Sequence, residues 1–389
     1  MDHASPDSTG RPYDWDPCEQ SVQGDQIAAY DELRERCPVA HSEAFGWSLL
    51  RHEDVVDALH DPGTFSSRVS VHVAIPNGMD PPEQLAFRQV VDDCFTPALV
   101  DAFAATLAEL AGKLVAQIAG GDQIEVMSEL AEPFAAQAQC AYLGWPAQVA
   151  ATLQQWSAQS TRATRSRDRA ELDRIAAGFG SIITGILQQL RSADPAQVPP
   201  VMSRLLTARV NGDLLTDGQL VSMLRNWTVG ELGTIAAAAG IVLEFLARRP
   251  DVQQLVRDNP QIRQSAMDEM LRLEPPLISN RRRTAKPVVV RGRTIPADQP
   301  VTILWPAAQR DPHTFEDPTE FRLDRSPADN LLYGRGPHYC PGEGLSRLEL
   351  GVLLDAFLEA VPQFSQVGVP VRAQHPAGGF TQIRISTAG

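Results

Sequence analysis

The stretch that decides the fold of this chain is residues 333–342, Y-G-R-G-P-H-Y-C-P-G. Cys340 lies in this glycine-rich loop, and the apolar pattern that follows over residues 343–354 predicts an amphipathic helix. Pro341 would then be the first helical residue, where its missing N–H is not needed. Cys340 would face the positive end of the helix dipole, which favours a thiolate. A thiolate in a loop with little water suits a soft metal such as haem iron.

The order of residues in this loop resembles the haem-ligand loop of the cytochrome P450 family. The pattern is aromatic-Gly-x-Gly-x-His-x-Cys-x-Gly-x-x-Leu-small-Arg, with Tyr333 in place of the usual Phe. The alternative interpretation is a buried structural cysteine before a helix. Further segments resemble the family in order and spacing, extend the resemblance over about residues 26–388, and look most like its soluble bacterial members. These segments are residues 51–67, 80–97, 269–272 and 310–318.

Length, composition and charge limit the class of protein. The 389 residues can bury a large core, and no linker, repeat or low-complexity segment divides them, so we expect one domain over residues 26–389. Residues 1–25 are polar and rich in Pro, Asp and Ser, which predicts a loosely ordered segment. No signal peptide and no uninterrupted apolar run of about 18 residues is apparent, so we expect no membrane association. The five scattered cysteines favour the cytoplasm, and the net charge of −14 argues against nucleic-acid binding.

The hydrophobic periodicity predicts a mainly α fold with a minor β portion near the C-terminal end. Nearly all of residues 82–247 has a helical pattern, and the longest uninterrupted part is residues 219–246. Short strands are expected at residues 46–50, within residues 288–304, and at residues 382–386. The resemblance implies a cytochrome P450-like fold in which the long central helix lies over the haem.

The resemblance implies which residues hold the iron of haem b (iron protoporphyrin IX). Cys340 would be the metal ligand, and Gly334 and Gly336 would shape the loop around the cofactor. A thiolate ligand pushes electron density onto the iron and favours O–O cleavage.

The resemblance also implies partners for the two haem propionates. These are His338, Arg88 and Arg283, because carboxylates in a partly dry site favour charged donors. Arg282 is a rival to Arg283, since the turn that follows is one residue short of the family pattern. Gln84 stands where bacterial members often have His, and we expect a weaker contact from its neutral amide.

Glu269 and Arg272 are three residues apart and share a helix face. In isolation such a pair is usually an exposed salt bridge of little consequence. The resemblance implies instead a buried structural pair that fixes the core on the haem side. The third partner in the family is often an Arg just before a Phe of the later loop. This chain has Glu320 before Phe321, which leaves that part of the network without its usual residue.

The central helix departs from the family pattern of a Gly followed by an acid and a Thr. Residues 228–234 read T-V-G-E-L-G-T. Aligned by the distance to Glu269, Thr234 takes the Thr position; aligned by the first glycine, Gly233 takes it and no alcohol is left there. In the first alignment Glu231 and Thr234 share a helix face and would act as a catalytic acid–alcohol relay for protons. Alternatively, Glu231 contacts the substrate or is solvated.

The resemblance places the substrate pocket at several mostly apolar positions, as expected for such a pocket. For each of them, core packing is the alternative. The positions are residues 71–75, Asn226, Val229, Leu277, Ile278 and Phe380.

Together these features predict an enzyme, a haem-thiolate monooxygenase. It would insert one oxygen atom from O2 into a small apolar organic substrate, by hydroxylation or a related oxidation such as O-dealkylation. Electrons would come from a separate ferredoxin and ferredoxin reductase, and the ferredoxin would dock near Cys340, where Arg335 and Arg347 supply positive charge. Two alternatives stay open: a peroxide-driven or atypical haem-thiolate enzyme, and a non-catalytic haem-binding sensor or carrier.

Overall fold

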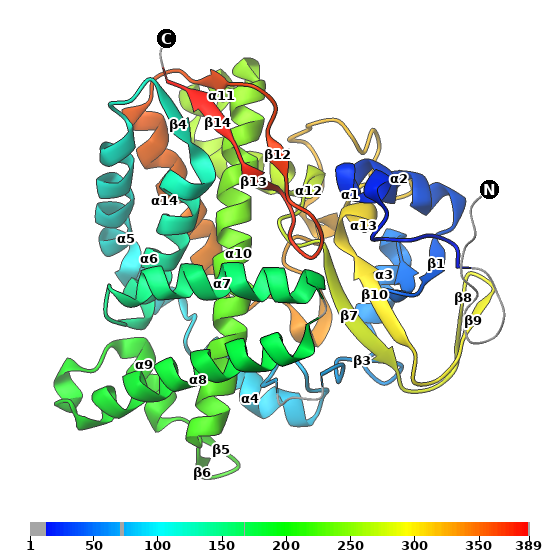
Figure 1. The fold of residues 1–389 in the computed structure, drawn as a ribbon, viewed down its shortest axis with the longest axis horizontal. Helices are drawn as coiled ribbons and strands as arrows, with labels where there is room; N and C mark the ends of the chain where they lie inside the picture. Colours follow the sequence, from blue (N-terminus) through cyan, green and yellow to red (C-terminus); the bar gives the residue numbers. More distant parts are fainter. Residues whose placement is uncertain (1–12, 71–73, 167, 388–389) are drawn as a thin grey trace.

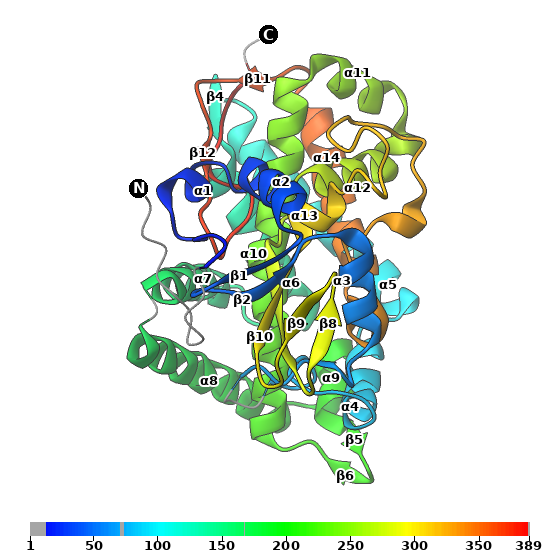
Figure 2. The ribbon, with the colours of Figure 1, turned by 90° about the vertical axis from the view of Figure 1, so that its right-hand side faces the viewer.

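A long helix, α10 (Asp217–Arg248), runs through the centre of the molecule (Figures 1 and 2). The computed structural model describes residues 13–70, 74–166 and 168–387. Helices gather on one side of α10 and most of the strands on the other, as Figure 1 shows. The predicted mainly α fold with a minor β portion is confirmed.

A capping box fixes the start of α10 at Thr216. The Thr216 hydroxyl accepts from the Gln219 N–H at 3.3 Å, and the Gln219 side chain accepts from the Thr216 N–H at 2.8 Å. The helix has 32 residues, a little more than the hydrophobic periodicity over residues 219–246 predicts. Within the described ranges it is the one helix that is long and apolar enough to cross a membrane, but 78% of its apolar window is buried inside the protein. Its apolar character is that of a core helix.

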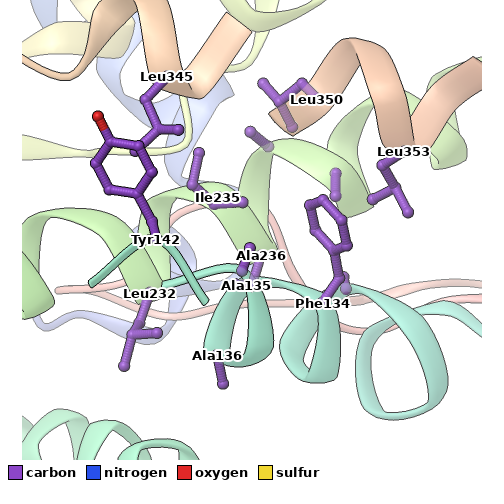
Figure 3. Packing of buried hydrophobic residues seen from close by; sticks show 14 of the residues in the cluster. Phe134, Ala135, Ala136, Tyr142, Leu232, Ile235, Ala236, Leu345, Leu350 and Leu353 are labelled. Atoms are coloured by element: carbon purple, nitrogen blue, oxygen red, sulfur yellow. The ribbon is translucent and has the colours of Figure 1, made fainter. Parts of the chain in front are cut away.

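Three helices form the main core with α10: α5 (Pro97–Ile118), α6 (Glu132–Leu143) and α14 (Glu343–Ala360). α6 and α14 pack directly against α10, and α5 packs against α14 and α6. Figure 3 shows side chains of α6, α10 and α14 meeting in one apolar layer. Two further helices, α7 (Val149–Ser166) and α8 (Arg169–Ser192), cross α10 in Figure 1. The other helices are α1 (Gln20–Gly24), α2 (Gln26–Arg36), α3 (His52–His60), α4 (Glu83–Asp92), α9 (Pro200–Thr207), α11 (Pro250–Asp258), α12 (Arg263–Leu273) and α13 (Trp305–Gln309), with a π-helical turn at Met127–Ala131.

The main sheet has five strands in the order β1-β2-β10-β7-β3. Their bounds are β1 (Val39–Ser42), β2 (Gly46–Leu49), β10 (Pro300–Leu304), β7 (Ser279–Thr284) and β3 (Phe65–Ser66). The sequence predicted β2 and β10 but not the other three. The register pairs Arg282 with Val301 and Arg283 with Pro300, and this decides which arginine faces the interior.

The remaining strands form small two- or three-stranded pairings. They are β4 (Gln123–Glu125), β5 (Arg209–Val210), β6 (Asp213–Leu214), β8 (Val288–Val290), β9 (Arg293–Ile295), β11 (Ser365–Gln366), β12 (Val371–Arg372), β13 (Phe380–Gln382) and β14 (Arg384–Ser386). The single strand predicted at residues 382–386 is divided between β13 and β14 at Ile383, whose N–H donates to Glu125 instead of continuing a ladder.

The described part of the N-terminal segment is held against the sheet region. The Asp14 carboxylate accepts from the His41 N–H at 2.6 Å and from Arg293 Nη1 at 2.5 Å, and α1 follows. Residues 13–25, assigned by composition to a loosely ordered segment, therefore have specific partners far along the chain. Residues 1–12 lie outside the described residues.

Candidate active site

The loop before α14 is shaped by two glycines with left-handed backbone. Gly334 has φ +72° and Gly336 has φ +71°. A Cβ on Gly336 would lie 2.3 Å from the backbone oxygen of Leu59, so no side chain fits there. The Cys340 N–H donates to the Tyr333 oxygen at 2.9 Å and closes the loop. The prediction that Pro341 is the first helical residue is wrong by two positions: α14 begins at Glu343, and Gly342 is its N-cap.

The Cys340 sulfur lies beside the N-terminus of α14 and accepts a hydrogen bond from the Gly342 N–H. Burial nevertheless raises the pKa of the Cys340 thiol, and the Gly342 N–H and the Arg88 charge only oppose this effect. The helix-end argument alone would have lowered the pKa. A metal cation bound to the sulfur would favour the thiolate at this buried position.

Three polar side chains surround the turn just before Cys340. Gln84 Nε2 donates to the Pro337 oxygen at 2.9 Å, and Arg88 Nη1 donates to the same oxygen at 3.2 Å. His338 Nε2 lies 3.0 Å from the Ser67 hydroxyl. The structure thus brings together three of the predicted propionate contacts, Gln84, Arg88 and His338.

Arg283 lies outside this group, contrary to the expectation, and its rival Arg282 lies inside it. Successive side chains of β7 point to opposite faces of the sheet, so Arg282 is buried while Arg283 is exposed. Arg283 pairs with the exposed Asp298 at 2.5 Å. Burial lowers the pKa of the Arg282 guanidinium, with a partial opposing effect from Asp80. Among the described residues, Arg282 makes no salt bridge with a carboxylate, and the hydrogen bond that its Nη1 donates goes to the Arg281 oxygen at 2.8 Å.

Positive charge is therefore concentrated around Arg282, Arg88 and His338. Burial and the neighbouring Arg282 and Arg88 lower the pKa of His338 to about 4, with a partial opposing effect from Asp80. A buried guanidinium without a carboxylate partner, beside a second guanidinium and an imidazole, is the donor set that an anionic carboxylate would satisfy. These residues, with the Cys340 sulfur next to them, fit a haem with two propionates.

One face of α10 is open near its middle. Val229 is 60% exposed, and a Cβ placed on Gly230 or Gly233 would meet no atom within 4 Å. Thr234 lies at the edge of this face, and its hydroxyl donates to the Gly230 oxygen at 2.5 Å. The glycines thus leave space along a helix that is buried elsewhere.

Glu231 and Thr234, expected to act as an acid–alcohol relay, do not contact each other through their side chains. Trp227 Nε1 donates to Glu231 Oε2 at 2.5 Å, and the Glu231 carboxyl lies beside Glu349 of α14, in the interior. Thr234 touches Glu231 only through the backbone oxygen of Glu231, at 3.2 Å. The Glu231 side chain points into the interior, whereas Thr234 lies at the edge of the open face, so the two side chains diverge. The solvated alternative for Glu231 is wrong, since Glu231 is buried.

The predicted pocket residues divide into two groups. Val229 lies on the open face, and Asn226 Nδ2 donates to the Ile75 oxygen at 3.0 Å, which ties α10 to the segment after residue 73. Ile278 and Phe380 are only 1% and 6% exposed and belong to core clusters, so core packing is the better interpretation for both. Residues 71–73 lie outside the described residues.

Glu269 and Arg272 form a buried pair joined by two hydrogen bonds of 2.8 and 2.7 Å. Arg272 also donates to the Gln309 oxygen at 2.7 Å. The missing third partner is Arg325, whose Nε donates to Glu269 Oε1 at 3.0 Å. It was not predicted because it lies after Phe321 and not before it, so only the folded loop shows that it reaches Glu269.

Comparisons with known proteins agree with this fold and site. The family model described as Cytochrome P450 matches residues 164–365. The chain is 29% identical over 360 residues to cyclomarin C epoxidase CymV of Salinispora arenicola, covering 87% of this chain and 90% of that protein. It is 29% identical over 379 residues to erythromycin C-12 hydroxylase of Saccharopolyspora erythraea, covering 93% and 94%. The solved structure of open cytochrome P450 EryK from S. erythraea superposes with a TM-score of 0.85 at 23% identity, covering 96% and 97%.

The chain belongs to the cytochrome P450 family. It is a haem-thiolate monooxygenase, an oxidoreductase whose cofactor is iron protoporphyrin IX held through a cysteine thiolate. The resemblance drawn from residues 333–342 is thereby confirmed.

Proposed function

We propose that Cys340 is the iron ligand and that Arg282, Arg88 and His338 hold the haem propionates, with Gln84 as a weaker neighbour. The observation that supports this most is the buried, carboxylate-free Arg282 beside His338, two residues from Cys340. Gly334 and Gly336 shape the loop, and Arg282 takes the role that the resemblance assigned to Arg283.

When bound, haem iron supplies the activation of O2 for oxidation of an organic substrate. The open face of α10, with Val229, Gly230 and Gly233, bounds the space where a substrate would lie. Thr234 is the residue of this face that can hold a proton, at Oγ1. Asn226 is a positioning residue, because its bond to Ile75 fixes one wall of that space.

The substrate class is proposed from the apolar open face and from the names of the relatives. Those proteins are named for the epoxidation of cyclomarin C and of epothilones C and D, and for hydroxylation of erythromycin. We infer a small, largely apolar organic molecule, oxidised by hydroxylation or a related reaction such as epoxidation or O-dealkylation.

For the electron supply we propose a ferredoxin with its reductase in the cytoplasm. Arg335 makes no salt bridge within the described chain and offers free positive charge near Cys340. Arg347 contributes less than expected, because its guanidinium pairs with Asp268 at 2.8 Å and with Glu343 at 3.1 Å. A peroxide-driven reaction is the second candidate, because no acid in the described part of the chain contacts the Thr234 hydroxyl.

Two measurements test the proposal. Purified holoenzyme is screened for compounds that shift the haem absorption band, and each hit is incubated with NADH, ferredoxin and reductase, or with hydrogen peroxide alone. Product with the donor proteins supports the ferredoxin reaction, and product with peroxide alone supports the second candidate. No product in either arm would contradict both and favour a sensor or carrier.

A further inference from the structure

Two glutamates meet in the interior between α10 and α14. Glu231 is 8% exposed and Glu349 is 1% exposed. Trp227 satisfies one oxygen of Glu231, but among the described residues no group donates a hydrogen bond to Glu231 Oε1 or to either carboxyl oxygen of Glu349. The layer around them is apolar: Figure 3 shows Ile235 of α10 near Leu345 and Leu350 of α14.

Two ionised carboxylates cannot satisfy each other, because an ionised carboxylate only accepts hydrogen bonds. Two negative charges side by side in an apolar layer are also costly. The groups that face the pair do not offset them. Cys140 and Tyr142 of α6 have pKa values raised by burial and stay neutral. Cys340 also lies near enough to Glu231 to interact with it, and a thiolate there would add negative charge. No salt bridge of the described chain includes either glutamate. A single proton between the two carboxyls removes one charge and supplies a donor.

We propose that Glu231 and Glu349 share one proton, and that Glu349 is thereby a positioning residue that holds the Glu231 carboxyl in the interior, away from Thr234. The pair joins the helix that carries the open face to the helix that follows Cys340. This proposal concerns the inner side of α10, so it does not depend on the substrate or the electron donor proposed above.

The direction of the pKa shifts agrees with this geometry. Burial raises the pKa of Glu231 to about 8 and raises the pKa of Glu349 as well. The two carboxyls then titrate as a unit, and the proton is lost only in alkaline solution. In the window between the ordinary value of 4.5 and about 8, the folded chain keeps a proton that the unfolded chain releases. Stability from this pair therefore falls as pH rises through that window.

Infrared difference spectroscopy of the holoenzyme tests the shared proton directly. Well below the Glu231 pKa, the wild type should show the carbonyl stretch of a buried protonated carboxylic acid, which moves to lower frequency in D2O. The band should disappear well above that pKa. It should also be lost in Glu231→Gln and in Glu349→Gln, because the new amide supplies the donor and the remaining glutamate ionises. The matched control is Glu244→Gln, since Glu244 is also buried on α10 but pairs with Arg248 at 3.1 Å and should not carry the band.

A band that is absent from the wild type at the lower pH, or that persists in both glutamate variants, would overturn the proposal. If neither variant folds, the wild-type titration decides: a band that does not disappear on raising the pH contradicts the shared proton. The positioning role has its own readout. Glu349→Leu removes the partner, and the infrared band of Glu231 should then shift in frequency and in its titration midpoint, whereas an unchanged Glu231 band would show that Glu349 does not hold it.

Discussion

Arg325 Nε lies 3.0 Å from Glu269 Oε1, and this contact completes a buried network of one carboxylate and two guanidiniums. Both guanidiniums also lie over the ring of Phe315, at 4.9 Å for Arg272 and 5.9 Å for Arg325. Arg272 and Arg325 therefore share an acid and an aromatic face. The network connects α12 to the loop that leads to Cys340.

Replacing Arg325 by Ala should reduce stability by about 1.5–3 kcal/mol, because a buried carboxylate loses one of its charged donors. The measurement is chemical unfolding of the holoenzyme together with haem content. Arg322→Ala is the matched control: its side chain pairs with the exposed Asp324 and Glu316, and its loss should change stability little. Equal effects of the two substitutions would contradict the network.

Replacing Glu269 or Arg272 by Ala should give little folded haem protein. Each change leaves the partner charge buried and unpaired, at a cost of about 3–5 kcal/mol. Yield of soluble holoenzyme per cell mass is the measurement. Normal yield and haem content from either variant would show that the pair contributes little.

Cys340→Ser should abolish the carbon-monoxide difference band that is typical of thiolate-ligated haem. Cys140→Ser is the control, because Cys140 is buried in the helical core and burial raises its pKa to about 12. If the band survives in Cys340→Ser and is lost in Cys140→Ser, the ligand assignment is wrong.

Arg282→Gln should weaken haem binding about 10- to 100-fold, since charge-assisted hydrogen bonds contribute about 1.5–3 kcal/mol. Arg283→Gln, on the same strand but facing solvent, should leave haem affinity almost unchanged. Haem transfer to an acceptor protein measures both. A larger loss in Arg283→Gln would return the assignment to the residue that the sequence favoured.

Thr234→Ala should lower the product formed per NADH consumed, because it removes the Thr234 hydroxyl at the edge of the open face while leaving haem binding intact. Thr234→Ser keeps the hydroxyl and should recover most of the coupling. An equal loss in Glu231→Gln, with a double variant no worse than either single one, would instead restore the relay between the two side chains. Unchanged coupling in Thr234→Ala would remove Thr234 from the proton path.

The features that the sequence predicted are local in the chain. The glycines around Cys340, the helical run over residues 219–246 and the i, i+3 pair of Glu269 and Arg272 depend on backbone preferences and on spacing within one element. Such features can be recognised without knowing where the element lies in the fold.

What only the tertiary structure decided is which side chains from distant elements meet. Strand register turned Arg282 inward and Arg283 outward, since neighbouring residues of a strand face opposite sides. The later loop brought Arg325 to Glu269, and the packing of α10 on α14 placed Glu231 against Glu349, away from Thr234. Helical spacing puts Glu231 and Thr234 on neighbouring positions of one helix. It does not reveal how deeply each side chain is buried or which groups it bonds to, and these determine where each side chain points.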